Sequence, residues 1–157
     1  MQYTLVDLLN AEHILLGARA GDAREAIHLL AAPLVRTGHV TAEFAGDVWK
    51  REQTFPTGLP TQPLPVAIPH ADPTFVNRSA VCFGTLESPV RFGQMGTDGS
   101  TELDIRLVFL LAIKEKEKQV EMIKQVMTLL QTPSLLEGLA RVKQVPQAYD
   151  LIRETLV

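Results

Sequence analysis

Apolar residues recur at helical spacing in two segments of the first third of the chain. Asp22 and Glu25 have the spacing of a capping box, and Gly38 is typical of the residue that follows a helix end. Between them the pattern predicts a helix with the inward positions Ala26, Ile27, Leu30, Ala31, Leu34 and Val35. A second helix is expected from a Thr41 cap to Arg51-Glu52, with the inward positions Phe44, Ala45, Val48 and Trp49.

The middle of the chain changes to short apolar runs that are typical of strands. A loop rich in turn-forming residues, TFPTGLPTQPLP, separates them from the helices, because a helix cannot continue through its prolines. Strands are predicted over 66–68, 80–86 and 103–113, with a turn at Asp98-Gly99 before the last one. The run LVFLLAI is apolar on both faces, which indicates a central strand covered by helices on both sides.

Helical spacing returns in the last third of the chain. The stretch 114–131 is predicted to place on one inward side Val120, Ile123, Val126, Met127 and Leu130. Pro133-Ser134 and Pro146 occupy positions typical of the first turns of two further helices. The order of helices, strands and helices around one fully buried strand predicts an α/β layered domain, without fixing the strand order.

Composition fits one globular domain over residues 1–157. The chain is 46% hydrophobic and 21% charged, and its length leaves little room for a second core. The net charge of −3 and the lack of a Lys/Arg cluster argue against nucleic-acid binding. We expect a cytoplasmic protein without membrane insertion, since no signal peptide is seen, the longest apolar run (107–113) is too short to cross a bilayer, and Cys82 has no disulfide partner.

His70 is the residue with the clearest chemical potential. It follows Pro69, which holds the preceding residue extended, at the end of an apolar run where open α/β sheets place their ligands. A neutral imidazole at such a place is able to accept and return a phosphoryl group. An ordinary loop histidine is the competing interpretation, and His70 taken alone favours it.

Three other positions have both a chemical and an ordinary interpretation. Arg51 is either a guanidinium for an anion on a facing loop or a cation that suits a helix C-terminus. Gln119 lies on the edge of the inward helical stripe, where its amide lines a cleft or simply belongs to the helix start. Thr57-Gly58 either offers a hydroxyl and an amide to an anion or forms a turn.

Other chemistries have weaker support in the sequence. His70 and Asp72 are two potential metal ligands without further partners at ligand spacing, and the expected role of Cys82 is packing in an apolar strand. Nucleotide-binding loops and the serine-hydrolase elbow are absent from the sequence, so we expect neither a cofactor nor a metal. The remaining histidines have no companions at chemically useful spacing; they are His13, His28 and His39.

Four stretches in this order resemble a known family: REQTFPTGL (51–59), VAIPHAD (66–72), PVRFGQ (89–94) and RLVFLLAIKEKEKQVEMI (106–123). The family is that of the enzyme IIA domains of the fructose–mannitol class in the bacterial phosphoenolpyruvate-dependent sugar phosphotransferase system. The resemblance covers nearly the whole chain and implies one mixed β-sheet flanked by helices on both sides.

The resemblance also implies a set of partners and residue roles. His70 would accept a phosphoryl group from the phosphocarrier HPr on its Nε2 (tele) nitrogen and pass it to a cysteine of a IIB component, and through it to the IIC permease. Arg51 matches the family arginine that neutralises the phosphoryl group, and we expect Thr57 to assist. Many members carry a second histidine where this chain has Gln119, which can donate a hydrogen bond but adds no charge. An apolar rim is expected around the site, formed by Phe55, Pro56 and Phe75.

The motifs leave the sugar and the biological role open. Galactitol-type members are similar in lacking the second histidine and in the Phe-Pro before Thr-Gly, so we favour a sugar alcohol such as galactitol. The alternative is a protein of the nitrogen-regulatory type, which shares the Pro-His motif but acts on regulatory targets and moves no sugar.

Overall fold

A mixed five-stranded sheet in the order β1-β4-β5-β3-β2 forms the frame of the protein. The computed structural model describes residues 4–156. β1 (Leu9–Ala18) is parallel to β4 (Ala80–Gly93), and β4 is antiparallel to β5 (Glu102–Ala112). β5 is in turn parallel to β3 (Val66–Ala67), which pairs antiparallel with β2 (Gly58–Leu59). The mixed α/β fold expected from the sequence is confirmed.

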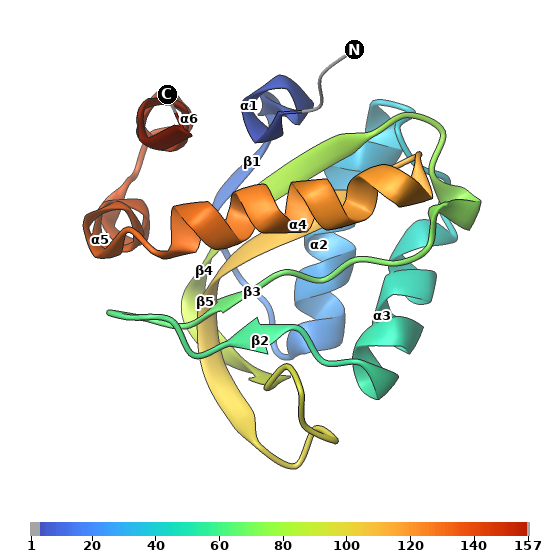
Figure 1. The fold of residues 1–157 in the computed structure, drawn as a ribbon, viewed down its shortest axis with the longest axis horizontal. Coiled ribbons are helices and arrows are strands. Elements are labelled where there is room, and N and C mark those ends of the chain that lie inside the picture. The colour runs from blue at the N-terminus through green and yellow to red at the C-terminus, as the bar shows by residue number, and fades with distance from the viewer. Residues whose placement is uncertain (1–3, 157) are drawn as a thin grey trace.

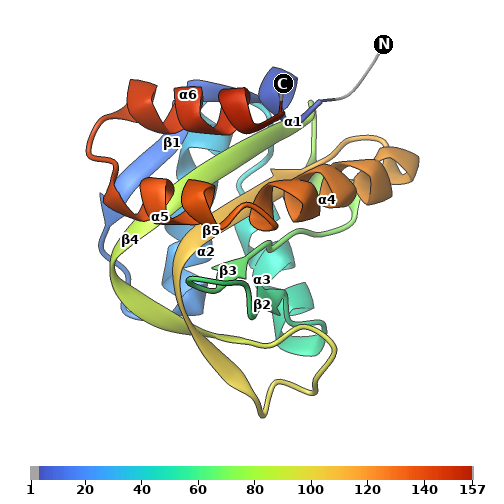
Figure 2. The same cartoon turned by 60° about the vertical axis from the view of Figure 1, so that its left-hand side comes forward.

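Helices cover both faces of this sheet (Figures 1 and 2). One face packs against α2 (Ala23–Arg36) and α3 (Phe44–Thr54). The other packs against α1 (Leu5–Leu8), α4 (Lys116–Leu130), α5 (Pro133–Arg141) and α6 (Val145–Leu156). Alternate residues of β5 enter the two cores, and every residue from 107 to 113 is fully buried, as the doubly apolar run predicted.

The capping signals of α2 are confirmed, whereas the expected cap of α3 is wrong. The Asp22 side chain accepts a hydrogen bond from the amide of Glu25 at 2.9 Å, and Gly38 follows the helix with a φ of 77°. α3, however, begins at Phe44, directly after Glu43, and no side chain caps it. Thr41 contributes its backbone, which pairs with the 3-10 helix η1 (Pro73–Phe75).

The predicted inward stripe of α4 is rotated in the structure. Val120 is 61% exposed and Met127 is 38% exposed, whereas the buried face consists of Met122, Val126, Leu129 and Leu130. The helix carries apolar residues on two sides, so its spacing allows two orientations, and packing against α1 and α5 selects one. Val35 of α2, 37% exposed, is a similar case.

Two elements before Asp22, α1 and β1, were not predicted. The expected order of helices, then strands, then helices is therefore wrong, because a strand precedes α2. α1 is a single turn, and β1 is an edge strand in which Asn10, Ala11 and Glu12 are all exposed. The register of β1 against β4 shifts twice, which removes the regular alternation that identifies a strand in a sequence. β2 was likewise missed because it is only two residues long.

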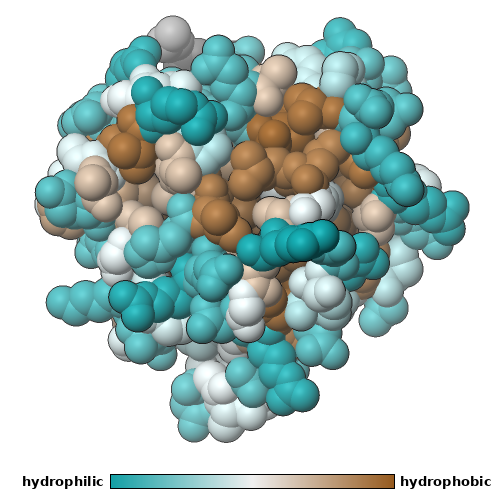
Figure 3. Space-filling view, turned by 180° about the vertical axis from the view of Figure 1, so that it is seen from behind, coloured by the Kyte–Doolittle hydropathy of each residue, from teal (hydrophilic) through white to brown (hydrophobic). Residues whose placement is uncertain are grey.

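The surface opposite to the view of Figure 1 carries an apolar area bordered by polar side chains (Figure 3). Within residues 4–156, no helix combines the length and the apolar character that a bilayer span requires.

Candidate functional site

His70 continues the line of β3 along β5 and does not lie in an open loop. Its backbone forms a parallel bridge with Leu111, whose amide donates to the carbonyl of Pro69 at 3.1 Å. This pairing holds the residue against the sheet, so that only 7% of its surface is exposed. His70 therefore does not have the exposure of an ordinary loop histidine, because the residue is largely buried.

The imidazole of His70 is fixed in one orientation. Its Nδ1 atom lies 2.8 Å from the carbonyl oxygen of Ile68. A carbonyl oxygen only accepts hydrogen bonds, so Nδ1 carries the proton and Nε2 carries the lone pair. Burial lowers the pKa of His70, the Ile68 carbonyl acts in the opposite direction, and the charge of Arg51 lowers the pKa further. The ring is consequently neutral at pH 7, with Nε2 available as a nucleophile.

Arg51 lies in the last turn of α3 and presents donors that no acidic side chain uses. Its guanidinium stacks on the ring of Phe55 at 5.2 Å, and its Nε atom is buried without a hydrogen-bond partner. Within residues 4–156, no carboxylate forms an ion pair with it. An arginine with unsatisfied donors beside a neutral histidine is a suitable site for an anion.

A hollow of about 290 Å³ connects Arg51 with the segment that follows His70. One wall comes from the end of α3, and the other comes from Ala71, Asp72 and Thr74. In Figure 1 the chain leaves β3 and passes between α4 and α3 at this place. The structure thus brings Arg51 and His70 together, although they are separated by 19 positions in the sequence (70 minus 51).

Gln119 reaches the same segment from the first turn of α4. Its side-chain amide donates to the backbone carbonyl of Ala71 at 2.7 Å. Because this carbonyl belongs to the residue after His70, Gln119 ties the start of α4 to the histidine segment. Gln119 thus lies beside the site, as expected, and its side chain binds a backbone carbonyl.

Thr57 lies close to the site but is not free to bind an external anion. Its amide and its hydroxyl both donate to the side chain of Glu52, each at 2.8 Å, and the residue is 3% exposed. A carboxylate of the chain itself occupies both donors of Thr57, so these contacts do not favour the phosphate-stabilising role expected of it. Glu52 was missed in the sequence, because nothing in the pattern distinguishes a buried glutamate from an exposed one at a helix end.

The expected apolar rim is only partly present. Phe55 is 59% exposed beside Arg51, as predicted. Pro56 is buried under Gly93, and Phe75 packs against the core below α2 and α3, so neither forms a rim. Val120, one residue after Gln119, was predicted to face the core but is an exposed apolar residue.

The competing chemistries find no support in this part of the fold. Among residues 4–156, no three His, Cys, Asp or Glu side chains gather as a metal site, and Asp72 faces Lys116 at 3.9 Å. Cys82 is fully buried in the core, as expected, and burial raises the pKa of its thiol to about 12.

Two histidines do have companions, which corrects the expectation from the sequence. The rings of His13 and His39 lie edge to face with 4.9 Å between their centroids, and both contact the hydroxyl of Thr37, at 2.9 Å and 2.8 Å. His13 is fully buried in β1, so this pair belongs to the packing between β1 and the end of α2.

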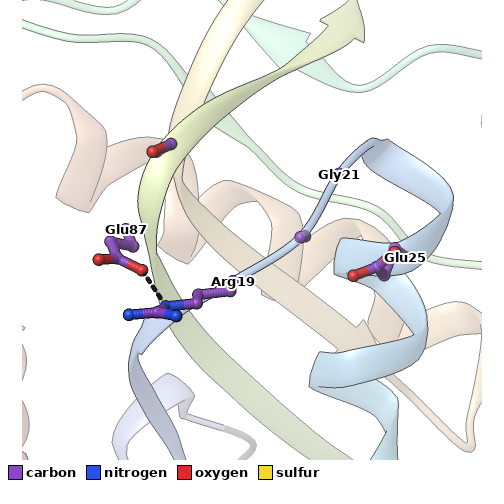
Figure 4. A pocket seen from close by; sticks show the side chains of 6 residues that line it. Arg19, Gly21, Glu25 and Glu87 are labelled. Carbon is purple, nitrogen blue, oxygen red and sulfur yellow. Dashed lines mark hydrogen bonds and ion pairs between the residues drawn. The ribbon is translucent and has the colours of Figure 1, made fainter.

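A second hollow, of about 400 Å³, lies between the end of β1, the start of α2 and β4 (Figure 4). Arg19 points across it and pairs with Glu87, while Glu25 lies on the α2 side. Its charged side chains are exposed and the arginine is paired, so this hollow lacks the buried nucleophile and the unpaired cation of the His70 site.

Residues 7–155 match the family described as "Phosphoenolpyruvate-dependent sugar phosphotransferase system, EIIA 2". The chain is 30% identical over 147 residues to the mannitol-specific EIICBA component of Escherichia coli, a match that covers 92% of this chain and 22% of that protein. It is 28% identical over 89 residues to the galactitol-specific EIIA component of Escherichia coli, covering 57% of this chain and 58% of that protein.

Among solved structures, the fold is similar to the complex of enzyme IIA and phosphorylated enzyme IIB for mannitol from Escherichia coli. The TM-score is 0.76 at 29% identity, and the match covers 94% of this chain and 99% of that chain. The chain spans less than two thirds of the length of either of these two curated relatives.

Proposed function

Since this chain belongs to the EIIA type-2 family of the phosphoenolpyruvate-dependent sugar phosphotransferase system, we propose that it is a phosphocarrier with His70 as its phosphorylated residue. The observation that carries the assignment is the hydrogen bond from Nδ1 of His70 to the Ile68 carbonyl, beside an arginine with unpaired donors. This arrangement leaves Nε2 as the nucleophile and supports a tele-phosphohistidine.

The phosphoryl group is transferred in two steps, each of which breaks one bond to phosphorus and forms another. The lone pair on Nε2 of His70 attacks the phosphorus of a phosphohistidine on HPr, and the electron pair of the breaking bond returns to the nitrogen of HPr. In the second step a cysteine thiolate of a IIB component attacks the same phosphorus, a sulfur–phosphorus bond forms, and Nε2 recovers its lone pair. The Ile68 carbonyl stabilises the positive charge on the ring while the phosphoryl group is attached.

Arg51 and Gln119 have different parts in this reaction. Arg51 supplies the positive charge for the phosphoryl oxygens, because its guanidinium is unpaired and faces the hollow beside Ala71. Gln119 fixes the backbone after His70 and adds no charge. No metal is needed for the charge balance if Arg51 and backbone amides contact the phosphoryl group.

The surface next to His70 supports transient contact with other proteins. Two exposed apolar side chains border the histidine segment: Phe55, which directly follows α3, and Val120 on α4. The likeness to a IIA domain solved together with a phosphorylated IIB domain supports a IIB component as one partner. We further propose HPr as the donor and IIC as the permease behind IIB, as the resemblance to the family implies.

The proposed substrate is a sugar or sugar alcohol. The similarity to known relatives gives little support for galactitol over mannitol. The galactitol-specific relative matches over a shorter stretch than the mannitol-specific one, at similar identity. A regulatory role of the nitrogen-regulatory type is the alternative that the experiment below separates from transport.

The test is phosphorylation by phosphoenolpyruvate, enzyme I and HPr, followed by transfer to a panel of IIB domains. One acid-labile, base-stable phosphoryl group is expected per chain, and His70→Ala should abolish it while His28→Ala, at an exposed position on α2, should not. Labelling that persists in His70→Ala would exclude the assignment. Phosphorylation without transfer to any IIB domain would favour the regulatory alternative.

A further inference from the structure

Glu52 is a buried carboxyl group beside the site, and it has no direct role in the transfer reaction proposed for His70. It lies in the last turn of α3 and is only 5% exposed. Within residues 4–156, no basic side chain forms an ion pair with it. Burial of a carboxyl group is costly unless its oxygens are hydrogen-bonded, so its contacts show what it holds in place.

Both oxygens of Glu52 contact the same residue. The amide of Thr57 donates to Oε2 and the hydroxyl of Thr57 donates to Oε1, each at 2.8 Å. A carboxylate accepts from both donors at once, and the two bonds close the turn that leads from α3 into β2. The position of Thr57 is therefore set by a side chain as well as by the backbone.

Thr57 passes this constraint to the histidine segment. Its carbonyl accepts from the amide of Ile68 at 3.3 Å, and the carbonyl of Ile68 accepts from Nδ1 of His70 at 2.8 Å. A continuous series of hydrogen bonds thus runs from Glu52 to the imidazole ring. The opposite edge of the same segment is held by backbone pairing with β5, which does not depend on any side chain.

We propose that Glu52 is a positioning residue for phosphoryl transfer, which acts through Thr57 and Ile68 to keep His70 in the tautomer with Nε2 unprotonated. The same contact fixes the turn of α3 that carries Arg51. The kinetic part of the inference rests on the proposed function, whereas the tautomer of His70 is a property of the free protein.

The ionisation of Glu52 makes this contact dependent on pH. Burial raises the pKa of Glu52 to about 7, while the hydrogen bonds from Thr57 and the charge of Arg51 act in the opposite direction. Other charged groups line the hollow on the far side of Glu52, on β4, β5 and the loop between them: Arg91, Asp98 and Glu102. Ionised Glu52 accepts both Thr57 donors, but protonated Glu52 has to donate its own proton to the hydroxyl. The histidine segment is therefore held in the arrangement seen here when Glu52 is ionised.

The direct test is nitrogen NMR of the histidine rings, because ring nitrogen shifts distinguish the tautomers. The variants are Glu52→Ala and Glu52→Gln, with Gln53→Ala as the matched control, since Gln53 is the exposed neighbour on the same helix turn. We expect wild type and Gln53→Ala to show Nδ1 of His70 protonated, and Glu52→Ala to show a mixture. Glu52→Gln should give the same signal at every pH, that of wild type below the pKa of Glu52, because its amide has the hydrogen-bonding pattern of the protonated carboxyl group. It should therefore lack the step that wild type shows near pH 7.

Phosphorylation rates from phospho-HPr provide the second readout. Glu52→Ala should be phosphorylated about 10- to 100-fold more slowly than wild type, because small displacements of a nucleophile have effects of this size. An unchanged tautomer and an unchanged rate in folded Glu52→Ala would overturn the proposal. If that variant does not fold, Thr57→Val decides: it removes only the hydroxyl bond, and an unaltered His70 signal in it would equally overturn the proposal. If wild type accepts no phosphate, the proposed function fails, and the NMR result still decides the role of Glu52.

Discussion

At the scale of single residues, the site combines a neutral nucleophile with a cation that has no counter-ion. Arg51 is held by Phe55 on one face and has a buried Nε without a partner. Leaving such a donor unsatisfied costs free energy that is recovered when an anion binds, so under the proposed function Arg51 would stabilise the phosphoryl group on His70.

This argument predicts a graded effect of substitution at Arg51. Arg51→Ala should lower the rate of phosphoryl transfer by about 100-fold, and Arg51→Lys by about 10-fold, because lysine retains the charge but not the planar set of donors. The rates are measured for transfer from phosphorylated His70 to a IIB domain, with circular dichroism as the control for folding. Rates equal to wild type in a folded Arg51→Ala variant would remove Arg51 from the mechanism.

The residues of the site differ in how well the sequence predicts them. Pro69 and the end of an apolar run made His70 a candidate, and the helix end beside a turn-rich loop did the same for Arg51. Only the resemblance to the enzyme IIA family favoured the chemical interpretation of either residue. The role of Glu52 was not predictable, because burial of a charged side chain depends on contacts between segments that the sequence does not bring together. The tautomer of His70 likewise depends on the direction of one carbonyl group.

At the scale of elements, the tip of the β4–β5 hairpin supports the turn between α3 and β2. Gly58 forms a bridge with Gln94, and the amide of Met95 donates to the carbonyl of Gly58 at 2.8 Å. A Cβ atom at Gly58 would lie 2.7 Å from the carbonyl oxygen of Gly93, and one at Gly93 would lie 2.9 Å from Cβ of Pro56. The two glycines therefore allow a close approach of the hairpin and the turn.

Gly93→Ala should disturb this approach and destabilise the protein by about 1–3 kcal/mol, the usual cost of overpacking. It should also slow phosphorylation of His70, because the displaced turn includes Thr57. Gly46→Ala is the matched control: beyond its chain neighbours and the backbone of its own helix, no atom lies within 4 Å of the added Cβ. Because Gly46 lies in the first turn of α3, its replacement by alanine should stabilise the protein by up to about 1 kcal/mol. Both free energies are measured by denaturant unfolding, and a destabilised Gly46→Ala beside an unaffected Gly93→Ala would contradict the account.

Element prediction succeeded where the apolar pattern has one interpretation and failed where it has two. β5 is apolar at every inner position, so its central place was evident. α4 has apolar residues on two sides, and only contacts with α1 and α5 show that Val120 faces solvent. β1 is an irregular edge strand. Its pairing with β4 is a tertiary contact that cannot be predicted from the pattern of its own residues.

At the scale of the whole molecule, the buried ionisable groups respond to pH in opposite directions. Burial lowers the pKa of His13, His39 and His70, with the neighbouring histidine acting on His13 and Arg78 acting on His39 in the same direction. Below pH 6.5, the unfolded chain binds more protons at these residues than the folded protein does, so acid destabilises the fold. Glu52 acts oppositely: its stabilising contribution is complete below pH 4.5 and is lost as the pH rises through about 7.

The histidine contribution can be isolated with His13→Gln, whose side-chain amide retains a donor for the Thr37 hydroxyl without a titrating ring. The free energy of unfolding of wild type should fall on acidification between about pH 7 and pH 5, as the unfolded chain gains protons that the folded protein excludes. His13→Gln should show a shallower fall, because one of the three histidines no longer contributes, and the remaining slope belongs to His39 and His70. His28→Gln, at an exposed position on α2, is the matched control variant. An identical slope in His13→Gln and wild type would mean that the His13–His39 pair is not a source of acid sensitivity. The same titration on Glu52→Gln should steepen the net fall on acidification, because the opposing contribution of Glu52 is removed.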